Sequence, residues 1–123
     1  MRFLIAEDNS RMRESIKRFI LGKMPDHHKF YEAADGGEAI ELYDRVSPDW
    51  VLMDIKMEPM DGLAASRAIL ASDPTARIIM LTSYDDAGYR KAAKEAGACA
   101  YILKEHLDTL HTFLTTDNQR RQQ

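Results

Sequence analysis

A single cysteine, Cys99, is present among 123 residues, so an intramolecular disulfide framework and a cysteine-rich zinc site are both excluded. No apolar run approaches the roughly 18 residues that a membrane-spanning helix needs. The apolar run that ends at Glu7 and Asp8 has only four residues, Phe3 to Ala6, and is too short for a signal peptide. We therefore expect a cytoplasmic protein that has no membrane partner.

An excess of basic charge is also lacking. The 17 lysines and arginines stand against 20 aspartates and glutamates, which gives a net charge of −3, whereas nucleic-acid-binding domains are usually basic. Apolar residues make up 45% and charged residues 30% of the chain, as in soluble globular proteins. This length suits one domain with a single core. We expect that domain over residues 1–116, followed by a polar tail or the start of a linker at 117–123.

The sequence alternates short apolar runs with amphipathic segments. The runs at 3–6, 50–53, 78–81 and 100–103 are apolar throughout, as expected of strands that are covered on both faces. A weaker run at 29–33 predicts an edge strand. Helical spacing marks Met12 to Ile20, Ala39 to Val46, Leu63 to Leu70, Asp86 to Ala96 and Leu107 to Leu114, and Asp35–Gly36–Gly37 is predicted as a turn. Five strand–helix units predict a parallel sheet with helices on both faces.

The four apolar runs each end in polar side chains. In an open parallel sheet the carboxyl ends of the strands share one edge, where ligands bind. The sequence therefore predicts one cluster of three carboxylates, a hydroxyl and an ammonium group. These belong to Glu7, Asp8, Asp54, Thr82 and Lys104.

This set of groups predicts phosphoryl chemistry. Three adjacent carboxylates repel one another and need a cation to remain ionised at neutral pH. Oxygen ligands of this kind suit Mg²⁺. Lys104 offers positive charge to an anion, and Thr82 offers a hydrogen-bond donor. A carboxylate nucleophile among these groups is equipped to accept and hold a phosphoryl group.

Five stretches of the chain, in this order and spacing, resemble the receiver domain of bacterial two-component response regulators over essentially the whole length. The resemblance is strongest to the subfamily that carries a C-terminal helix-turn-helix output domain. It implies a flavodoxin-like (βα)5 three-layer sandwich with a parallel five-stranded sheet in the order 2-1-3-4-5. The stretches are Leu4–Asp8, Val51–Met57, Met60–Gly62, Ile79–Ser83 and Gly97–Lys104.

The same resemblance assigns roles to the residues of the predicted cluster. It implies that Asp54 accepts a phosphoryl group from a sensor histidine kinase or a phosphotransfer protein. Asp8 and Asp54 would bind Mg²⁺ with the main-chain carbonyl of Lys56, and Glu7 would assist through water. The phosphoryl oxygens would be held by Thr82 and Lys104.

The resemblance also implies how the signal leaves the domain. Thr82 and Tyr101 match the family's switch residues, and the face of the fourth helix, fifth strand and fifth helix would control an output that we expect to be transcriptional. Such a domain is a phosphoacceptor switch with slow self-dephosphorylation and not a turnover enzyme. DNA would be contacted only through an output domain that is absent from this chain. The resemblance leaves open a homodimer, and it leaves open whether the chain is free-standing or a fragment.

Two departures from the family pattern concern prolines. The proline after the phosphoacceptor stands one position late, as Pro59 after Glu58, and Glu105 follows Lys104 where the family often has a cis proline. Without proline a cis bond costs roughly 2.5–4 kcal/mol, so we expect a trans bond after Lys104.

Two side chains are predicted to tune dephosphorylation. Lys56 and Tyr84 stand two residues after Asp54 and Thr82, where they would flank a water that attacks the phosphoryl group. Lysine has no acceptor with which to orient that water, and tyrosine is bulky, so we expect a long-lived phosphorylated state.

Two other functions fit parts of the pattern. An aspartyl-phosphate phosphohydrolase resembling haloacid dehalogenases needs a second aspartate two residues after the nucleophile, where this chain has Lys56. A receiver-like module that binds partners without phosphorylation would not need all five cluster positions filled. Outside the cluster, we expect Cys99 to be a small packing residue, and we expect surface positions for the four histidines, which are His27, His28, His106 and His111.

Overall fold

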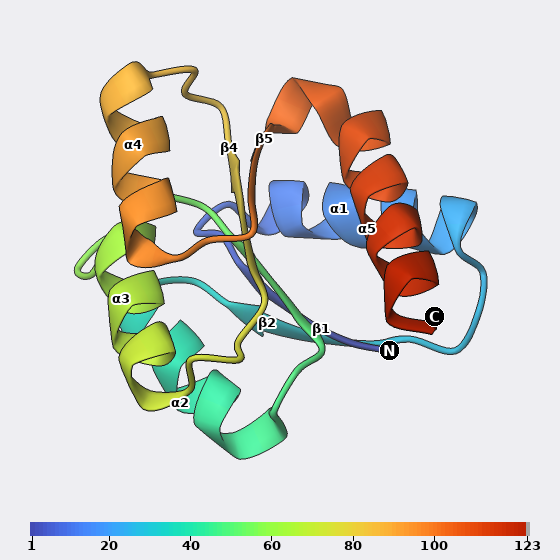
Figure 1. The fold of residues 1–123 in the computed structure, drawn as a ribbon, viewed down its shortest axis with the longest axis horizontal. Coiled ribbons are helices and arrows are strands. Elements are labelled where there is room, and N and C mark those ends of the chain that lie inside the picture. The colour runs from blue at the N-terminus through green and yellow to red at the C-terminus, as the bar shows by residue number, and fades with distance from the viewer. Residues whose placement is uncertain (123) are drawn as a thin grey trace.

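Five parallel strands form one sheet in the order β2-β1-β3-β4-β5 in the computed structural model, which describes the backbone of residues 1–122 and the side chains of residues 1–116 (Figure 1). This confirms the predicted fold class. The elements are β1 (Arg2–Ala6), α1 (Ser10–Lys23), β2 (Lys29–Ala33), α2 (Gly36–Val46), β3 (Trp50–Met53), α3 (Gly62–Ser72), β4 (Ile78–Thr82), α4 (Ala87–Ala96), β5 (Ala100–Leu103), a 3-10 turn (Lys104–His106) and α5 (Leu107–Gln122).

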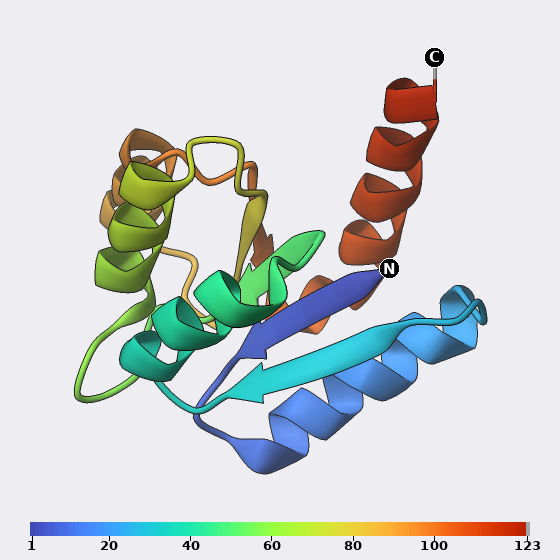
Figure 2. The same ribbon diagram turned by 90° about the horizontal axis from the view of Figure 1, so that it is seen from below.

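Helices cover both faces of the sheet, with α1 and α5 on one side and α2, α3 and α4 on the other (Figures 1 and 2). Alternate residues of a strand point to opposite faces. In β1, Leu4 and Ala6 therefore join the core beneath α2–α4, while Phe3 and Ile5 join the core beneath α1 and α5. This double burial explains why the central strands are apolar throughout. No helix in the part of the chain that the structure describes is long and apolar enough to cross a membrane.

The edge position of β2 is confirmed, and its burial is correspondingly incomplete. The turn predicted at Asp35–Gly37 is wrong, because Gly36 and Gly37 already belong to the first turn of α2. The Asp35 side chain accepts a hydrogen bond from the Glu38 amide (2.9 Å), and the Glu38 side chain accepts one from the Ala34 amide (3.1 Å). This reciprocal cap starts the helix at the glycines.

Two expectations outside the site need correction. Cys99 is exposed and not packed, because it lies in the connection before β5 and its side chain is directed toward solvent. Of the four histidines only His27 and His106 are exposed; His111 is half-buried, and so is His28, whose ring packs edge-on against Phe3 with centroids 5.4 Å apart.

Two other expectations concern the end of the chain and its peptide bonds. The backbone of α5 continues to Gln122, while the side chains of 117–123 lie outside the described residues, so the boundary at residue 116 stays a prediction. Among the described residues the cis peptide is Glu58–Pro59, and the bond after Lys104 is trans as expected.

The loop between β3 and α3, residues 55–61, closes tightly on the end of β3. The Gly62 amide donates to the Ile55 carbonyl (2.9 Å). A Cβ atom on Gly62 would lie 1.8 Å from the Asp54 carbonyl oxygen, a distance that no side chain tolerates. Glycine at position 62 therefore lets α3 begin directly against Asp54.

Candidate functional site

The carboxyl edge of the sheet carries the cluster that the sequence predicts. One carboxylate oxygen each of Glu7, Asp8 and Asp54 lies within 4.8 Å of the others. The Lys104 ammonium, from the end of β5, donates to Glu7 and to Asp54 Oδ2, the latter at 3.2 Å. Thr82 ends β4 at the same edge, fully buried, and its hydroxyl accepts a hydrogen bond from the Tyr84 amide (3.3 Å).

The sheet itself holds these side chains in place. The Asp54 amide donates to the Ala6 carbonyl and the Glu7 amide donates to the Ala33 carbonyl, both at 2.9 Å, so the β-ladder extends to the site. Asp54 Oδ1 accepts from the Ile55 amide at 2.9 Å. The carboxylate of Asp54 is thus fixed on one side by backbone and on the other by Lys104.

The three carboxylates differ in their exposure to solvent. Glu7 and Asp54 are 2% and 5% exposed, whereas Asp8 faces solvent. Glu7 Oε2 is buried and has no hydrogen-bond partner among the described residues. A buried oxygen without a partner is costly, and it stands in an all-oxygen cluster of the kind that hard divalent cations bind. The donor set therefore fits Mg²⁺.

Burial controls the charge of these groups. Burial first, and then Asp54, raises the pKa of Glu7 from 4.5 to about 7, although Lys104 opposes the shift. Burial lowers the pKa of Lys104, but its hydrogen bond to Glu7 and the charge of Asp54 outweigh burial, so the net shift is upward. Lys104 is accordingly a permanent cation, and Glu7 is more readily protonated than an ordinary glutamate.

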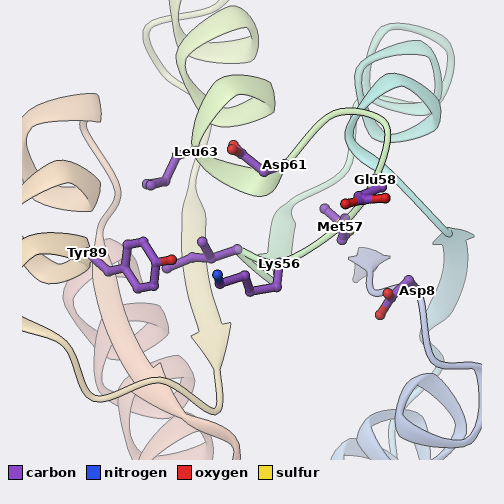
Figure 3. Close-up of a pocket in the computed structure, with 8 residues that line it drawn as sticks. Asp8, Lys56, Met57, Glu58, Asp61, Leu63 and Tyr89 are labelled. Carbon is purple, nitrogen blue, oxygen red and sulfur yellow. The ribbon is translucent and has the colours of Figure 1, made fainter.

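Lys56 lines the same pocket as the acidic cluster, and its ammonium lies over two aromatic rings. Its ammonium lies 5.3 Å from the centre of the Tyr84 ring and 5.5 Å from that of Tyr89, and the two rings meet edge to face. Figure 3 shows the Lys56 side chain extending toward Tyr89, with Asp8 on its other side. Two cation–π contacts thus tie the β3–α3 loop to the β4–α4 connection and to α4.

Tyr101 is connected to the same segment from the other side. Its hydroxyl donates to the Tyr84 carbonyl, and the Arg90 guanidinium lies 4.6 Å from the centre of its ring. Sequence reasoning did not single out Tyr89 or Arg90. Both lie on α4, and no local pattern marks them, because their partners lie on other elements.

A family comparison accounts for this arrangement. The sequence model of the family described as the response regulator receiver domain matches residues 3–115 of this chain. The chain belongs to this family. Receiver domains are regulatory switches of two-component signalling that partner with histidine kinases or phosphotransfer proteins, and they bind Mg²⁺ at an acidic pocket. The resemblance inferred from the sequence is confirmed.

Individual relatives show the same kinship. The transcriptional regulatory protein DegU of Brevibacillus brevis is 33% identical over 105 residues, which are 85% of this chain and 44% of that protein. The chemotaxis protein CheY of Listeria monocytogenes is 39% identical over 104 residues, 85% of this chain and 86% of that protein. The chain thus spans about half the length of regulators such as DegU.

Solved structures extend the likeness to the fold. A LuxR-family DNA-binding response regulator from Staphylococcus aureus aligns with a TM-score of 0.84 at 25% identity, over 94% of this chain and 96% of that one. The CheX–CheY–BeF3–Mg²⁺ complex from Borrelia burgdorferi aligns with a TM-score of 0.76 at 28% identity, over 84% of this chain and 77% of that one.

The raised pKa of Glu7 predicts a pH-dependent stability of the metal-free protein. In the unfolded chain Glu7 titrates near 4.5, so between that pH and about 7 the folded state binds the extra proton. Stability therefore falls as pH rises through this window, by on the order of 3 kcal/mol.

Urea unfolding at pH 5 and at pH 7.5, with a chelator present, measures this loss. Glu7→Gln should show a smaller decline than wild type, and Glu41→Gln, at an exposed position of α2, should behave as wild type. An equal decline in wild type and Glu7→Gln would contradict the assignment.

Proposed function

We propose that the chain is a phosphorylation-controlled switch in which Asp54 accepts a phosphoryl group from a histidine of a kinase or phosphotransfer protein. The observation that carries this proposal is the buried Asp54 carboxylate held between Lys104 and the acidic pair at the sheet edge. An Asp54 oxygen forms the new bond to phosphorus while the phosphorus–nitrogen bond of the phosphohistidine breaks. The imidazole leaves with the bonding electron pair and takes up a proton.

Two side chains would act directly on the transferring phosphoryl group, and four further residues would act through Mg²⁺. Lys104 supplies positive charge beside Asp54, and the Thr82 hydroxyl donates to a phosphoryl oxygen. Asp8, Asp54 and the main-chain carbonyl of Lys56 would hold Mg²⁺, with Glu7 assisting through water. When bound, the ion neutralises negative charge on the phosphoryl oxygens. The Mg²⁺ present in the related CheX–CheY complex supports this set.

Asp54→Asn tests the phosphoacceptor directly. Wild type incubated with a small phosphodonor and Mg²⁺ should gain one phosphoryl group by intact mass. The side-chain amide of the variant is a poor nucleophile, so Asp54→Asn should gain none. Asp44→Asn, at an exposed position of α2, is the control and should be labelled like wild type.

The outcomes also separate the alternative functions. Undiminished labelling of Asp54→Asn would place the acceptor elsewhere. Multiple-turnover release of phosphate from a generic phosphoester would favour a phosphohydrolase. A wild-type protein that is never labelled would favour a phosphorylation-independent binding module.

Phosphorylation would change the face formed by α4, β5 and α5. A phosphoryl group adds about −1.5 to −2 charges beside Thr82. We propose that the Thr82 hydroxyl, which now accepts from the Tyr84 amide, turns toward the phosphoryl group. Tyr101 then leaves the Tyr84 carbonyl and fills the space that Thr82 vacates. The phosphoryl group shifts the population because it interacts differently with the two packings.

Beryllofluoride with Mg²⁺, a mimic of the aspartyl phosphate, tests the switch. We expect the ring of Tyr101 to lose exposure and mobility by NMR, because it moves inward. Tyr31 on β2, which is also half-buried, is the internal control and should not change. If Tyr101 keeps the same exposure and mobility with the mimic bound, the switch role is wrong.

The phosphorylated state should be long-lived. Tyr84 is 46% exposed beside the site, where its ring can obstruct an attacking water. The Lys56 ammonium, held against Tyr84 and Tyr89, donates hydrogen bonds but cannot accept one from that water. We infer that Lys56 and Tyr84 together slow hydrolysis.

Lys56→Asn and Tyr84→Ala should each shorten the half-life of the phosphoprotein. We expect roughly threefold or more, which corresponds to about 0.7 kcal/mol of barrier. The decay is followed in Mg²⁺ without kinase, with Lys91→Asn on the exposed face of α4 as the control. Half-lives that stay unchanged or lengthen in both variants would contradict the shielding account.

Output and partners follow from the relatives. Because DegU is a transcriptional regulatory protein and the Staphylococcus aureus relative is a DNA-binding regulator, we favour a transcriptional output in which DNA is contacted by an output domain and not by this one. A cytoplasmic location suits a regulator with a transcriptional output. A homodimer through the switch face is compatible with the proposal.

A further inference from the structure

The β3–α3 loop, which follows Asp54, is hydrogen-bonded to the first residue of a different helix, α2. The Gly36 amide, at the start of α2, donates a hydrogen bond of 2.9 Å to the Met60 carbonyl. Gly36 is buried at this contact. The first amides of a helix have no partner within the helix, and the helix dipole favours an oxygen there. The β3–α3 loop thus uses a donor that α2 cannot use itself.

The backbone at the start of α2 is itself held by capping hydrogen bonds. Asp35 caps the helix through the Glu38 amide, and Glu38 returns a hydrogen bond to the Ala34 amide. Both bonds fix the backbone on either side of Gly36. The position of Met60 is therefore tied to a capped helix.

The approach of the two backbones is too close for any side chain at position 36. A Cβ atom there would lie 2.8 Å from the Met60 carbonyl oxygen and 2.9 Å from the Asp61 carbonyl oxygen, and also 2.8 Å from Met60 Cγ. At Gly37 the nearest atom to an added Cβ is the Asp35 side-chain oxygen, at 3.3 Å. Two adjacent glycines of one helix turn thus differ in the space around them. A Cβ atom at position 36 would meet the loop backbone, and one at position 37 would not.

The loop is fixed at its other points as well. Gly62 bonds back to the Ile55 carbonyl, the Asp61 side chain caps α3 through the Ala64 amide (2.8 Å), and Met57 is buried in the core. A displacement of Met60 and Asp61 must therefore be taken up within a short, constrained segment that adjoins Lys56. That residue carries the carbonyl proposed for Mg²⁺.

We propose that Gly36 is a positioning residue for phosphorylation, because it lets the amino end of α2 set the loop on which the Lys56 carbonyl lies. This role rests on the proposed function of Asp54. It assigns to α2, which has no side chain in the site, a part in the affinity for Mg²⁺ and in the rate of phosphoryl acceptance.

Gly36→Ala and Gly37→Ala form a matched pair of variants. Both replace a glycine of the first turn of α2. Only the first must push the loop backbone aside, whereas the Cβ atom at position 37 meets the Asp35 side-chain oxygen at 3.3 Å. We expect Gly36→Ala to weaken Mg²⁺ binding about three- to tenfold by calorimetry and to slow labelling by a small phosphodonor at saturating Mg²⁺. Gly37→Ala should stay within about twofold of wild type, and Asp8→Ala should lose the ion.

Two measurements separate positioning from a general loss of stability. Unfolding by urea shows whether Gly36→Ala is folded under the binding conditions. If it is folded, a lower stability by itself leaves its dissociation constant for Mg²⁺ unchanged, so a weaker affinity reports on positioning. Met60→Ala in the Gly36→Ala background removes the contact with Cγ and leaves both carbonyl contacts, so the Mg²⁺ defect should persist. Full rescue by Met60→Ala would overturn positioning through the backbone.

Wild-type protein provides a test that needs no variant. On addition of Mg²⁺ the Gly36 amide resonance should shift more than that of Gly37, because Gly36 is bonded to the loop. If Gly36→Ala does not fold, this comparison of amide shifts tests the positioning role of Gly36 in its place. Equal shifts of Gly36 and Gly37 would overturn that role.

The remaining outcomes distinguish this role from the proposed function. Wild type that is labelled on Asp54 while both glycine variants behave alike refutes only the role of Gly36. Wild type that takes up neither Mg²⁺ nor a phosphoryl group refutes the proposed function, and this role with it.

Discussion

Lys104 compensates two buried carboxylates, Glu7 and Asp54, and the other features of the site depend on this charge balance. Two carboxylates this close inside a protein are unfavourable without a cation, because burial and mutual repulsion both oppose their ionisation. One ammonium cannot satisfy both groups completely, and Glu7 Oε2 is left without a partner among the described residues. The site is thereby arranged to gain from a further cation and from an anion that Lys104 can reach.

The scaffold tolerates this arrangement because the backbone, rather than flexible side chains, holds the groups in place. The amides of Glu7 and Asp54 are part of the β-ladder, and the loop after Asp54 closes through glycines at two contacts. Because Gly62 has no Cβ atom, the Asp54 carbonyl can lie against it, and the carbonyls of Met60 and Asp61 lie against Gly36 for the same reason. Side chains at either position would move the loop that adjoins Asp54, the proposed phosphoacceptor.

A chain of contacts leads from the site to the face formed by α4, β5 and α5. Lys56 touches Tyr84 and Tyr89, the Tyr84 carbonyl accepts from Tyr101, and Arg90 of α4 covers the ring of Tyr101. Tyr84 therefore links the loop after Asp54 to Tyr101. The two cations, Lys56 and Arg90, are exposed, and each cation–π contact is worth about a kcal/mol or less, which suits the proposal that a new charge at Asp54 rearranges them.

The strand–helix order, the doubly covered central strands, the β2 edge and the residues of the acidic cluster could all be predicted from the amino-acid sequence. These features are local: a buried parallel strand must be apolar throughout, and the residue that ends it must lie at the shared edge. The folded arrangement was needed to show that the glycines after Asp35 begin a helix, that Cys99 is exposed and His28 half-buried, and that Tyr89 and Arg90 lie near the site. Those outcomes depend on caps, close backbone approaches and cation–π contacts between residues far apart in the chain, and no periodicity in the sequence encodes which elements meet.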